Sequence, residues 1–571
     1  MFALLPPELL RRIGNKTARL EDRKSLRLTC SLFGEAFQPH VLAEVTLNIH
    51  GSNLALGLCL LETLASREKD FKQLPSSDIS KHIRTLYIDA LSPSFSPESD
   101  ADFERKKGRC QYTHEIEQQR RSWVKIEDRT SSVSDAEKIL KSLLQPALTS
   151  LRCVDTIRWR RHRKDSEWVL KTVMNSISTS SLCSNIREFT LWYTPSDMNT
   201  ESPIPLPDMC QVQTLFVHGE VSNTMSILAL MDHTIISTAS LTTVGLFCAG
   251  YDYSYPALRR TIPPNICNLG LDRFSFAIPQ VVHNKLLSLE IGDVCIGDGI
   301  DDLWLALSLD QIHLRTLVVS HLYTTIDGLL DYLQSYSGLE VLSIRGSSYI
   351  TPKYDDDAKR FYSDILPMHE QTLVKLEVKP VFESRWCFSP YNVKAFQTCR
   401  RLRSLWIKVD HKGLEPDAKQ DAKLKTQTGP CSAADLPVAY QDQNSMHYMN
   451  SVHLLLDMIS SSLPELEKLT IEPARSRLLA HDHADFMFGV AHIFGVRRRI
   501  LASFKSFHVR HTTLTNHSDV LKWVKVYIGE DRLLLSVDRK AEEAKEISAR
   551  MPHRIPILSN VSGALRKLFR A

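Results

Sequence analysis

The sequence predicts an α/β fold in which a solenoid of parallel strands and intervening helices follows a small helical module. Three observations predict it. A short strand pattern, apolar-x-x-apolar-x-apolar, recurs along the chain, and its spacing is mostly even over the starts at Ile186, Val212, Leu241, Leu271, Leu286, Leu314, Leu339, Leu373 and Leu402. Segments of helical periodicity lie between these strands. Such regular recurrence is typical of repeat proteins, whose strands stack side by side.

The length and composition agree with a repetitive globular protein. A chain of 571 residues, 43% hydrophobic and 24% charged, can bury a large core but is too long for one ordinary domain. Because 70 Lys and Arg face 66 Asp and Glu, the net charge is only +4, and nucleic acid is not an expected partner. No run reaches the roughly 20 apolar residues of a membrane-spanning helix, so we expect no membrane segment.

The expected location is inside the cell, in the cytoplasm, the nucleus or both. Pro6 and Pro7 interrupt the apolar start of the chain before a secretory signal of usable length could form. The 12 cysteines are scattered without a CxxC pair, which favours reduced thiols and argues against a zinc ribbon.

Residues 1–45 form the predicted helical module. A first helix is expected over Leu5–Ile13, because proline suits the first turn and Glu8 favours the positive end of the helix dipole. A second helix is expected over Leu26–Phe33, ending near Pro39. A module of this size has a small core, so its apolar face should pack against the next domain or against a partner.

Residues 46–538 form the predicted solenoid. Its expected strands are Ile83–Ile88, Ile186–Leu191, Val212–Val217, Leu241–Leu246, Leu271–Phe276, Leu286–Ile291, Leu314–Val319, Leu339–Ile344, Leu373–Val378, Leu402–Ile407, Leu466–Ile471 and Phe504–Val509. The expected helices between them include Trp168–Ile177, Met225–Ile235, Ile326–Tyr336 and Met446–Leu463.

Two polar stretches interrupt the solenoid, and a cap is expected to close it. Residues 92–135 and 411–447 are rich in Ser, Pro, Lys, Asp and Gln and are interpreted as loop insertions. Strand patterns at Val520–Ile528 and Leu533–Val537 precede a C-terminal cap or tail over residues 539–571, which would shield the last repeat.

The N-terminal motif resembles the F-box. The residues that carry the resemblance are Leu5-Pro6-Pro7-Glu8-Leu9-Leu10, followed by Leu26-Arg27-Leu28-Thr29-Cys30 and Phe33. Pro39-His40-Val41-Leu42, which leads into Val45-Thr46-Leu47, resembles the fungal type in which an F-box is joined to leucine-rich repeats. The resemblance implies an irregular leucine-rich-repeat solenoid, a horseshoe of parallel strands with helices outside.

The resemblance also implies a function without catalysis. A protein of this family is a substrate receptor of an SCF-type cullin ubiquitin ligase, in which the F-box docks on a Skp-type adaptor, and through it on a cullin, while the repeats hold a target protein. The adaptor-binding residues that the resemblance implies are Leu5, Pro6, Leu9, Leu10, Ile13, Leu26, Leu28, Cys30 and Phe33. For each of them, ordinary packing inside the module remains an alternative.

Two departures from the family open further alternatives. Gly14, Asn15, Lys16 and Thr17 stand where the F-box usually continues with apolar residues, so the chain could be a leucine-rich-repeat scaffold with a degenerate F-box that does not join a ligase. The repeats also lack the usual asparagine after the strand, which predicts an irregular horseshoe. An enzyme with an unrecognised site on the strand wall is a third alternative.

The candidate target-binding residues alternate with the core positions of the strands, because strand side chains point alternately to opposite faces. They are Tyr87, Trp192, Phe216, Phe247, Arg345, Lys375, Lys379, Trp406, Lys408, His508 and Arg510. Aromatic and basic side chains anchor many protein interfaces, so the hypothesis is a target with acidic and apolar features. Partial burial of these aromatics beneath loops is the alternative.

Other chemistry has little support in the sequence. The basic runs Arg158–Lys164 and Arg497–Arg499 could be nuclear-import or polyanion patches, but solvated faces are favoured. His481, His483 and Asp485 lack a spaced fourth ligand for a metal. Phosphate-binding, nucleophile-elbow and metalloprotease motifs are absent from the sequence, so no catalytic residue, cofactor or metal is expected.

Overall fold

The structure is a computed structural model. It describes residues 9–10, 16–17, 20–28, 31–65, 79–95, 133–162, 164–179, 184–193, 211–220, 240–249, 257–258, 265–272, 275–276, 285–292, 300–320, 326–346, 353–410, 414, 450–476, 486–514, 524–528 and 531–535. The chain divides into two compact units, Met1–Leu314 and Arg315–Ala571, which are considered one at a time.

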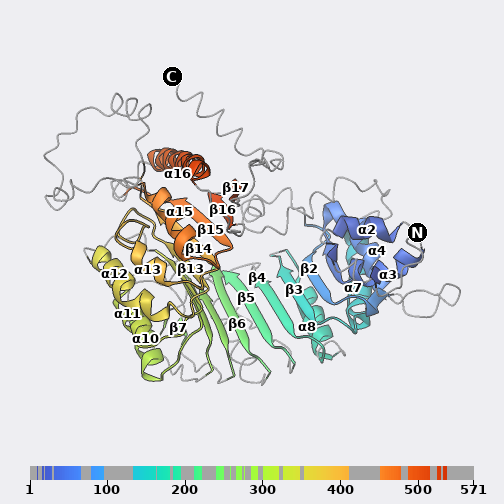
Figure 1. Ribbon diagram of the computed structural model, residues 1–571. Coiled ribbons are helices and arrows are strands. Elements are labelled where there is room, and N and C mark those ends of the chain that lie inside the picture. Colours follow the sequence, from blue (N-terminus) through green and yellow to red (C-terminus); the bar gives the residue numbers. More distant parts are fainter. Residues whose placement is uncertain are drawn as a thin grey trace, which may run out of the picture. The chain divides into compact units, whose positions relative to one another are not determined.

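The first unit is built on a parallel sheet whose strands follow one another in sequence order (Figure 1). Its strands are β1 (Glu44–Ile49), β2 (Thr85–Leu91), β3 (Thr156–Arg161), β4 (Glu188–Tyr193), β5 (Thr214–Glu220), β6 (Thr243–Ala249), β8 (Asn268–Asp272) and β10 (Ser288–Gly292). The short strands β7 (Ala257–Leu258) and β9 (Ser275–Phe276) form a separate pair. The α-helices are α2 (Leu20–Arg27), α3 (Ser31–Val41), α4 (Leu54–Ala65), α7 (Val133–Ser150), α8 (Glu167–Thr179) and α10 (Ile300–Leu309), with single 3₁₀ turns at Gly51–Asn53 and Ile79–Lys81.

A repeated pair of backbone hydrogen bonds fixes each new strand to the one before it. The N–H groups of Arg84 and Thr85, at the start of β2, both donate to the carbonyl of Ala43, each at 2.9 Å. The N–H groups of Asp155 and Thr156 then donate to the carbonyl of Arg84, at 2.9 and 3.1 Å, and the pattern continues at each of the following strands up to β10. Because the bonds use only backbone groups, they form with any residue except proline at the donor positions.

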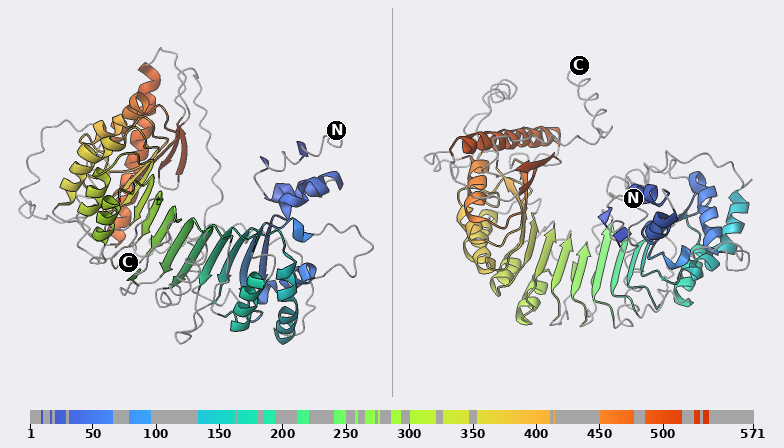
Figure 2. Two further views of the ribbon diagram at one scale, coloured as in Figure 1. Left: turned by 90° about the horizontal axis from the view of Figure 1, so that it is seen from below. Right: turned by 45° about the vertical axis from the view of Figure 1, so that its right-hand side comes forward.

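The helices bury an apolar stripe against one face of the strands. Leu140, Leu144 and Leu148 of α7 are spaced by four residues and are fully or almost fully buried. Leu86 and Ile88 of β2 are also buried. Figures 1 and 2 show α4, α7 and α8 on one side of the strands. The other side carries the alternating residues Tyr87 and Asp89, which are partly exposed.

The second unit repeats this arrangement. Its strands are β11 (Thr316–Ser320), β12 (Val341–Arg345), β13 (Lys375–Lys379), β14 (Ser404–Val409), β15 (Lys468–Pro473), β16 (Val524–Ile528) and β17 (Asp531–Leu535). They pair in parallel up to β16, and β17 returns antiparallel to β16. Its helices are α11 (Asp327–Gln334), α12 (Tyr354–Arg360), a π turn (Phe361–Ile365), a 3₁₀ turn (Leu366–His369), α13 (Val393–Thr398), α15 (Ser451–Ser462) and α16 (Phe486–Leu514). Figure 2 shows the helices as a layer along one side of the strands.

An aromatic cluster fills the core beneath the helices of the second unit. Trp386 lies with its ring centroid 5.2 Å from that of Phe361, and Tyr362 lies 5.4 Å from Phe396. The buried polar atoms are satisfied, since the Trp386 indole donates to the Tyr354 carbonyl at 2.9 Å and the Tyr362 hydroxyl to the Trp386 carbonyl at 2.8 Å. The cluster thereby holds in place the segment around Trp386, which has no regular secondary structure.

The predicted α/β arrangement of repeating parallel strands and helices is confirmed. Two predicted strands are wrong. The predicted strand Leu271–Phe276 joins the end of β8, which spans Asn268–Asp272, to β9, which belongs to the separate pair with β7. The predicted strand Phe504–Val509 lies within the helix α16. Its apolar residues Val496, Ile500, Phe504 and Phe507 are buried at spacings of four and three, which is the period of a helix. The strand pattern matched three of its residues by coincidence.

Three other details of the prediction change. The expected helix Leu26–Phe33 is wrong, because α2 ends at Arg27 and α3 begins at Ser31 and continues past Pro39 to Val41. Strand β3 was not predicted. The expected insertion over residues 92–135 ends earlier, since α7 begins at Val133.

Several expectations lie outside the described residues. They are the helix Met225–Ile235, most of both insertions, the group His481, His483 and Asp485, and the tail 539–571. Among the helices that the structure describes, none is both long and apolar enough to cross a membrane.

Candidate protein-binding faces

In each unit, most side chains on the strand face opposite the apolar core are half-buried or exposed. This face is called the partly exposed face of the unit. In the first unit, the parallel register aligns these side chains in rows across neighbouring strands. One row contains Tyr87, Arg158, Thr190, Phe216, Gly245 and Gly270, and the next contains Arg160, Trp192, His218, Phe247 and Asp272.

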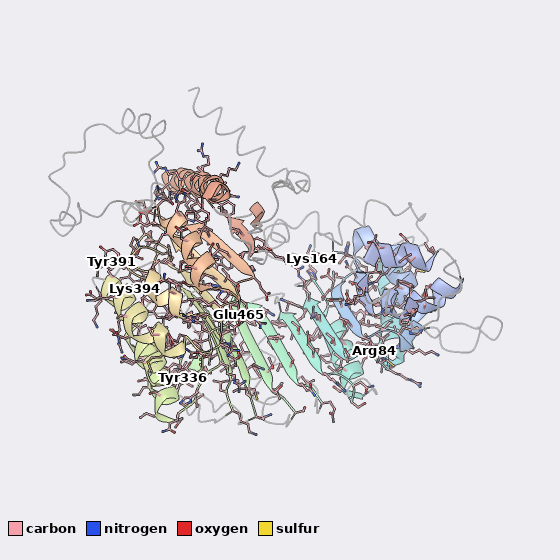
Figure 3. The ribbon with its side chains drawn as sticks, in the orientation of Figure 1. Arg84, Lys164, Tyr336, Tyr391, Lys394 and Glu465 are labelled. Atoms are coloured by element: carbon pink, nitrogen blue, oxygen red, sulfur yellow. The ribbon has the colours of Figure 1, made fainter. Side chains whose placement is uncertain are left out.

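The basic run Arg158–Lys164 is not one solvated patch, because Arg158 to Arg161 form most of β3. Arg158 donates to Glu188 Oε1 from Nε and Nη2, at 3.2 and 3.0 Å, and its guanidinium lies over the Tyr87 ring. Arg161 points to the other side, is 5% exposed and stacks on Tyr193 at 4.8 Å. Lys164 lies near the end of the strand (Figure 3), with its ammonium over the Phe95 ring. The charges are therefore distributed over two faces and one strand end.

Three stacked rings form the aromatic part of the first partly exposed face. The His218 ring lies between Trp192 and Phe247, with centroid distances of 5.1 and 4.6 Å and interplanar angles of 11° and 14°. Burial lowers the pKa of His218 to about 4, so the imidazole is neutral at pH 7. These rings form an apolar ridge across β4, β5 and β6.

Gly245 provides the space that Phe216 and Phe247 occupy beside this ridge. A Cβ at Gly245 would lie within 3 Å of both rings, whereas a Cβ at Gly495 in α16 would meet no atom within 4 Å. We expect Gly245→Ala to lower the free energy of unfolding by about 1–3 kcal/mol, because the rings must move in a packed row. The matched Gly495→Ala should raise it by about 0.5–1 kcal/mol through helix propensity. Urea unfolding followed by circular dichroism measures both, and equal stability of Gly245→Ala and wild type would contradict the packing argument.

On the second unit, charged side chains surround Glu377 of β13. The Glu377 carboxylate binds Lys375 Nζ at 2.7 Å and Lys379 Nζ at 2.6 Å, and Ser343 Oγ donates to it at 2.9 Å. The side chains of Glu377 and Lys379 are 6% and 9% exposed. The Lys379 ammonium also lies 2.9 Å from the centroid of the Trp406 ring, a cation–π contact.

Burial and these contacts shift the pKa of both charged groups. Burial alone would raise the pKa of Glu377, but the hydrogen bonds from Lys375 and Lys379 outweigh it and hold this pKa at about 2. Burial lowers the pKa of Lys379 to about 8, against the opposing effect of Glu377. At neutral pH the carboxylate is therefore charged, and so is most of the Lys379 population.

No protein-family model and no curated protein matches this chain. The faces are therefore interpreted from their own geometry.

The structure brings most of the predicted target-binding residues onto the two partly exposed faces. Tyr87, Trp192, Phe216 and Phe247 are half-buried on the first unit, and Lys375, Trp406, Lys408 and the exposed Arg345 lie on the second. Lys379 corrects the expectation of an exposed lysine, because it is buried between Glu377 and Trp406. His508 and Arg510 correct the expectation of strand residues, because they lie in α16. The arginines Arg497 and Arg499 of the same helix are half-buried, and Arg498 is exposed.

The predicted adaptor-binding residues divide into buried and exposed ones. Leu10 is fully buried with Phe37 and Ala36, and Leu26 packs against this cluster, as the alternative of internal packing expected. Leu9 and Leu28 are 43% and 84% exposed. Leu5, Pro6, Ile13 and Cys30 lie outside the described residues, as does the side chain of Phe33.

A histidine and two aspartates at the ends of β2 and β3 have a structural role. His162 Nε2 lies 2.8 Å from Asp89 Oδ1, and Asp165 accepts the backbone N–H groups of Leu91 and His162, each at 2.9 Å. Burial raises the pKa of Asp165 to about 6. Because both Asp165 oxygens bind backbone groups, this carboxylate fastens the turn after β3 to β2. Within the described ranges, no group of three or more His, Cys, Asp or Glu side chains could hold a metal ion.

Sequence reasoning missed His218, Arg158, Glu188 and Glu377 as members of the faces. The signal was present for His218, which follows Phe216 by two residues and therefore points to the same side. It was also present for Glu377, which lies midway between Lys375 and Lys379. Strand β3 was missed although Val154, Ile157 and Trp159 supply the three apolar positions of the strand pattern, and all three are fully buried.

Proposed function

We propose that the protein is the substrate receptor of an SCF-type cullin ubiquitin ligase, with no chemistry of its own. Its N-terminal helices dock on a Skp-type adaptor, and its partly exposed strand faces hold a target protein. The observation that carries the proposal is the division of the leucines in the N-terminal module. Leu10 forms the module's own core, while Leu9 and Leu28 are exposed.

Exposed leucines on a small module support docking. Burying a leucine on binding contributes roughly 1.5–3 kcal/mol, so a pair of them provides a substantial part of a specific contact. Because Leu10 and Leu26 already pack internally, the module can keep its structure when the exposed pair is changed. Docking and folding can therefore be separated by mutation.

The partly exposed faces support target binding. They present Tyr87, Trp192 and Phe247 on one unit and Trp406 beside lysines on the other, and these residue types are enriched among the side chains that contribute most to protein interfaces. A receptor that holds a target beside a ubiquitin-conjugating enzyme accelerates transfer by raising the local concentration of the target's lysines. Such a role needs binding surfaces rather than catalytic groups.

The test is a pull-down of the purified full chain with a Skp-type adaptor. Wild type should bind the adaptor. Leu9→Asp/Leu28→Asp should retain at least tenfold less adaptor, because each aspartate would place a charge where a leucine would be buried in the complex. The matched control is Leu305→Asp/Leu309→Asp, which changes two leucines of α10 that are 57% and 72% exposed, and which should bind like wild type.

Circular dichroism must first show that all three proteins are folded. Absence of adaptor binding by folded wild type would sink the ligase assignment and leave the repeat scaffold with a degenerate F-box. Equal loss in the two double variants would show that the contact is non-specific.

A further inference from the structure

We propose that the second unit binds an acidic, extended segment of a partner protein through Arg345 and Lys408, which lie on either side of the buried Lys379. The inference rests on the proposed function only in taking this partner to be the ligase target. The binding itself is a property of strands β12, β13 and β14.

The three cations form a row across neighbouring strands. Arg345 pairs with Lys379 in the parallel register of β12 and β13. Val378 pairs with Ile407, and the next residues along these two strands are Lys379 and Lys408. Neighbouring strands lie about 4.8 Å apart, so the row places three positive charges within roughly 10 Å. All three residues alternate with buried apolar residues and share the partly exposed face.

Carboxylates of the described chain balance only the middle cation of this row, Lys379. Glu377 already binds Lys375, Lys379 and Ser343. Among the described residues, neither the Arg345 guanidinium nor the Lys408 ammonium has a hydrogen-bonded or ion-pair partner. Glu472 aligns with Lys408 in the register and interacts with it only at longer range.

The unbalanced charges make an anionic ligand favourable. Like charges on directly opposed strand positions destabilise a sheet, so the row is held together at a cost that an anion would relieve. Burial lowers the pKa of Lys408, and Arg475 acts in the same direction. An incoming anion therefore meets a cation that water solvates incompletely, and charge complementarity is strongest in such a place.

The spacing of the charges favours several carboxylates rather than one phosphate. A single phosphate is compact and is best bound by arginine forks and backbone N–H groups that converge on one point. Here two lysines, which act as point charges, and one arginine are spread over three strands. Alternate side chains of an extended peptide lie about 6.6–7 Å apart, so two or three Asp or Glu residues can reach the row. The Trp406 ring next to Lys379 offers an apolar surface to the peptide's other side chains.

The experiment measures fluorescence anisotropy of labelled peptides with the purified full chain. The probe is a fluorescein-labelled peptide of six Glu-Ala repeats, and the neutral comparison has six Gln-Ala repeats. A third peptide, of Ser and Ala with one phosphoserine, tests the phosphate alternative. The proteins are wild type, Arg345→Gln/Lys408→Gln, and the control Lys394→Gln/Arg400→Gln. The control removes the same charge from two exposed positions, Lys394 within α13 (Figure 3) and Arg400 just after it.

We expect the Glu-Ala peptide to bind wild type and the control with the same Kd, and the row variant to bind it at least tenfold more weakly. The Gln-Ala peptide should not bind, and added salt should weaken the Glu-Ala complex. Absence of Glu-Ala binding by folded wild type would overturn the proposal, as would an equal loss in the control. Tighter binding of the phosphoserine peptide than of the Glu-Ala peptide would assign the row to phosphate and also overturn it.

The adaptor pull-down separates this inference from the proposed function. The row variant should retain the adaptor like wild type, because its changes lie in the second unit and the adaptor contact lies in residues 1–45. Peptide binding without adaptor binding would leave the inference standing and sink the ligase assignment. Adaptor binding without peptide binding would support the ligase assignment and overturn the inference about the charged row.

Discussion

Trp159→Ala is expected to lower the free energy of unfolding by about 3–5 kcal/mol, the range for removing a fully buried large side chain. Trp159 of β3 is 0% exposed, and its indole N–H has no hydrogen-bond partner among the described residues. The substitution therefore removes packing and no hydrogen bond, and the loss reports the cavity that it leaves. Urea unfolding monitored by circular dichroism measures the effect.

Trp192→Ala is the matched control for this result. Trp192 lies on the neighbouring strand β4 but on the partly exposed face, where it stacks on His218. Its removal should cost less than that of Trp159, because Trp192 is only half-buried and the site can fill with water. Losses of equal size in the two variants would contradict the assignment of the two tryptophans to opposite faces.

Glu377→Gln is expected to lower the free energy of unfolding by about 3–5 kcal/mol at pH 7, because breaking a buried ion pair leaves uncompensated charges. The pKa of Glu377 is about 2 in the folded protein and near 4.5 in a free peptide. A depressed pKa contributes stability above the unfolded value, and that contribution disappears as pH falls through the folded value. The difference between wild type and variant should thus be complete above about pH 4.5 and shrink toward pH 2.

Glu340→Gln provides the control for Glu377→Gln. Glu340 pairs with Arg315 at 3.6 Å, and both side chains are about half exposed or more, so its loss should cost less than about 1 kcal/mol. Adding Lys379→Met to Glu377→Gln should recover part of the lost stability, since it removes one of the two stranded cations. Failure of the second change to recover any stability would contradict the ion-pair explanation. Unfolding curves at several pH values test all of these variants.

The strands of both units could be predicted where three aliphatic positions repeat, as at Leu402–Ile407 and Leu339–Ile344. The prediction failed at β3, although Val154, Ile157 and Trp159 supply the three apolar positions of the pattern. The arginines around Trp159 indicate a basic run in the sequence, yet one of them, Arg161, is buried because its guanidinium can stack on Tyr193 of the next strand. The prediction also failed in α16, where only the spacing of Val496, Ile500 and Phe504 reveals the helix.

The candidate faces could be predicted in position but not in chemistry. Alternation along each strand assigns Lys379 of β13 and Trp406 of β14 to the face opposite the core. It cannot show that Lys379 is buried beneath Trp406, because that contact joins two strands that are separated in the sequence, through a register that only the folded sheet defines. The neutral state of His218 likewise depends on its neighbours Trp192 and Phe247.

The backbone bonds that join each strand start to the previous turn have an evolutionary consequence. Strands β8 and β10 begin at Asn268 and Ser288, whereas β14 and β15 begin at Ser404 and Lys468. The connection between β14 and β15 is much longer than that between β8 and β10, yet both pairs of strands are in parallel register without a shift. Insertions and deletions between strands therefore leave the alignment of the surface rows unchanged. A lineage can lengthen its connections freely and change its binding specificity separately, by single substitutions at the alternating positions.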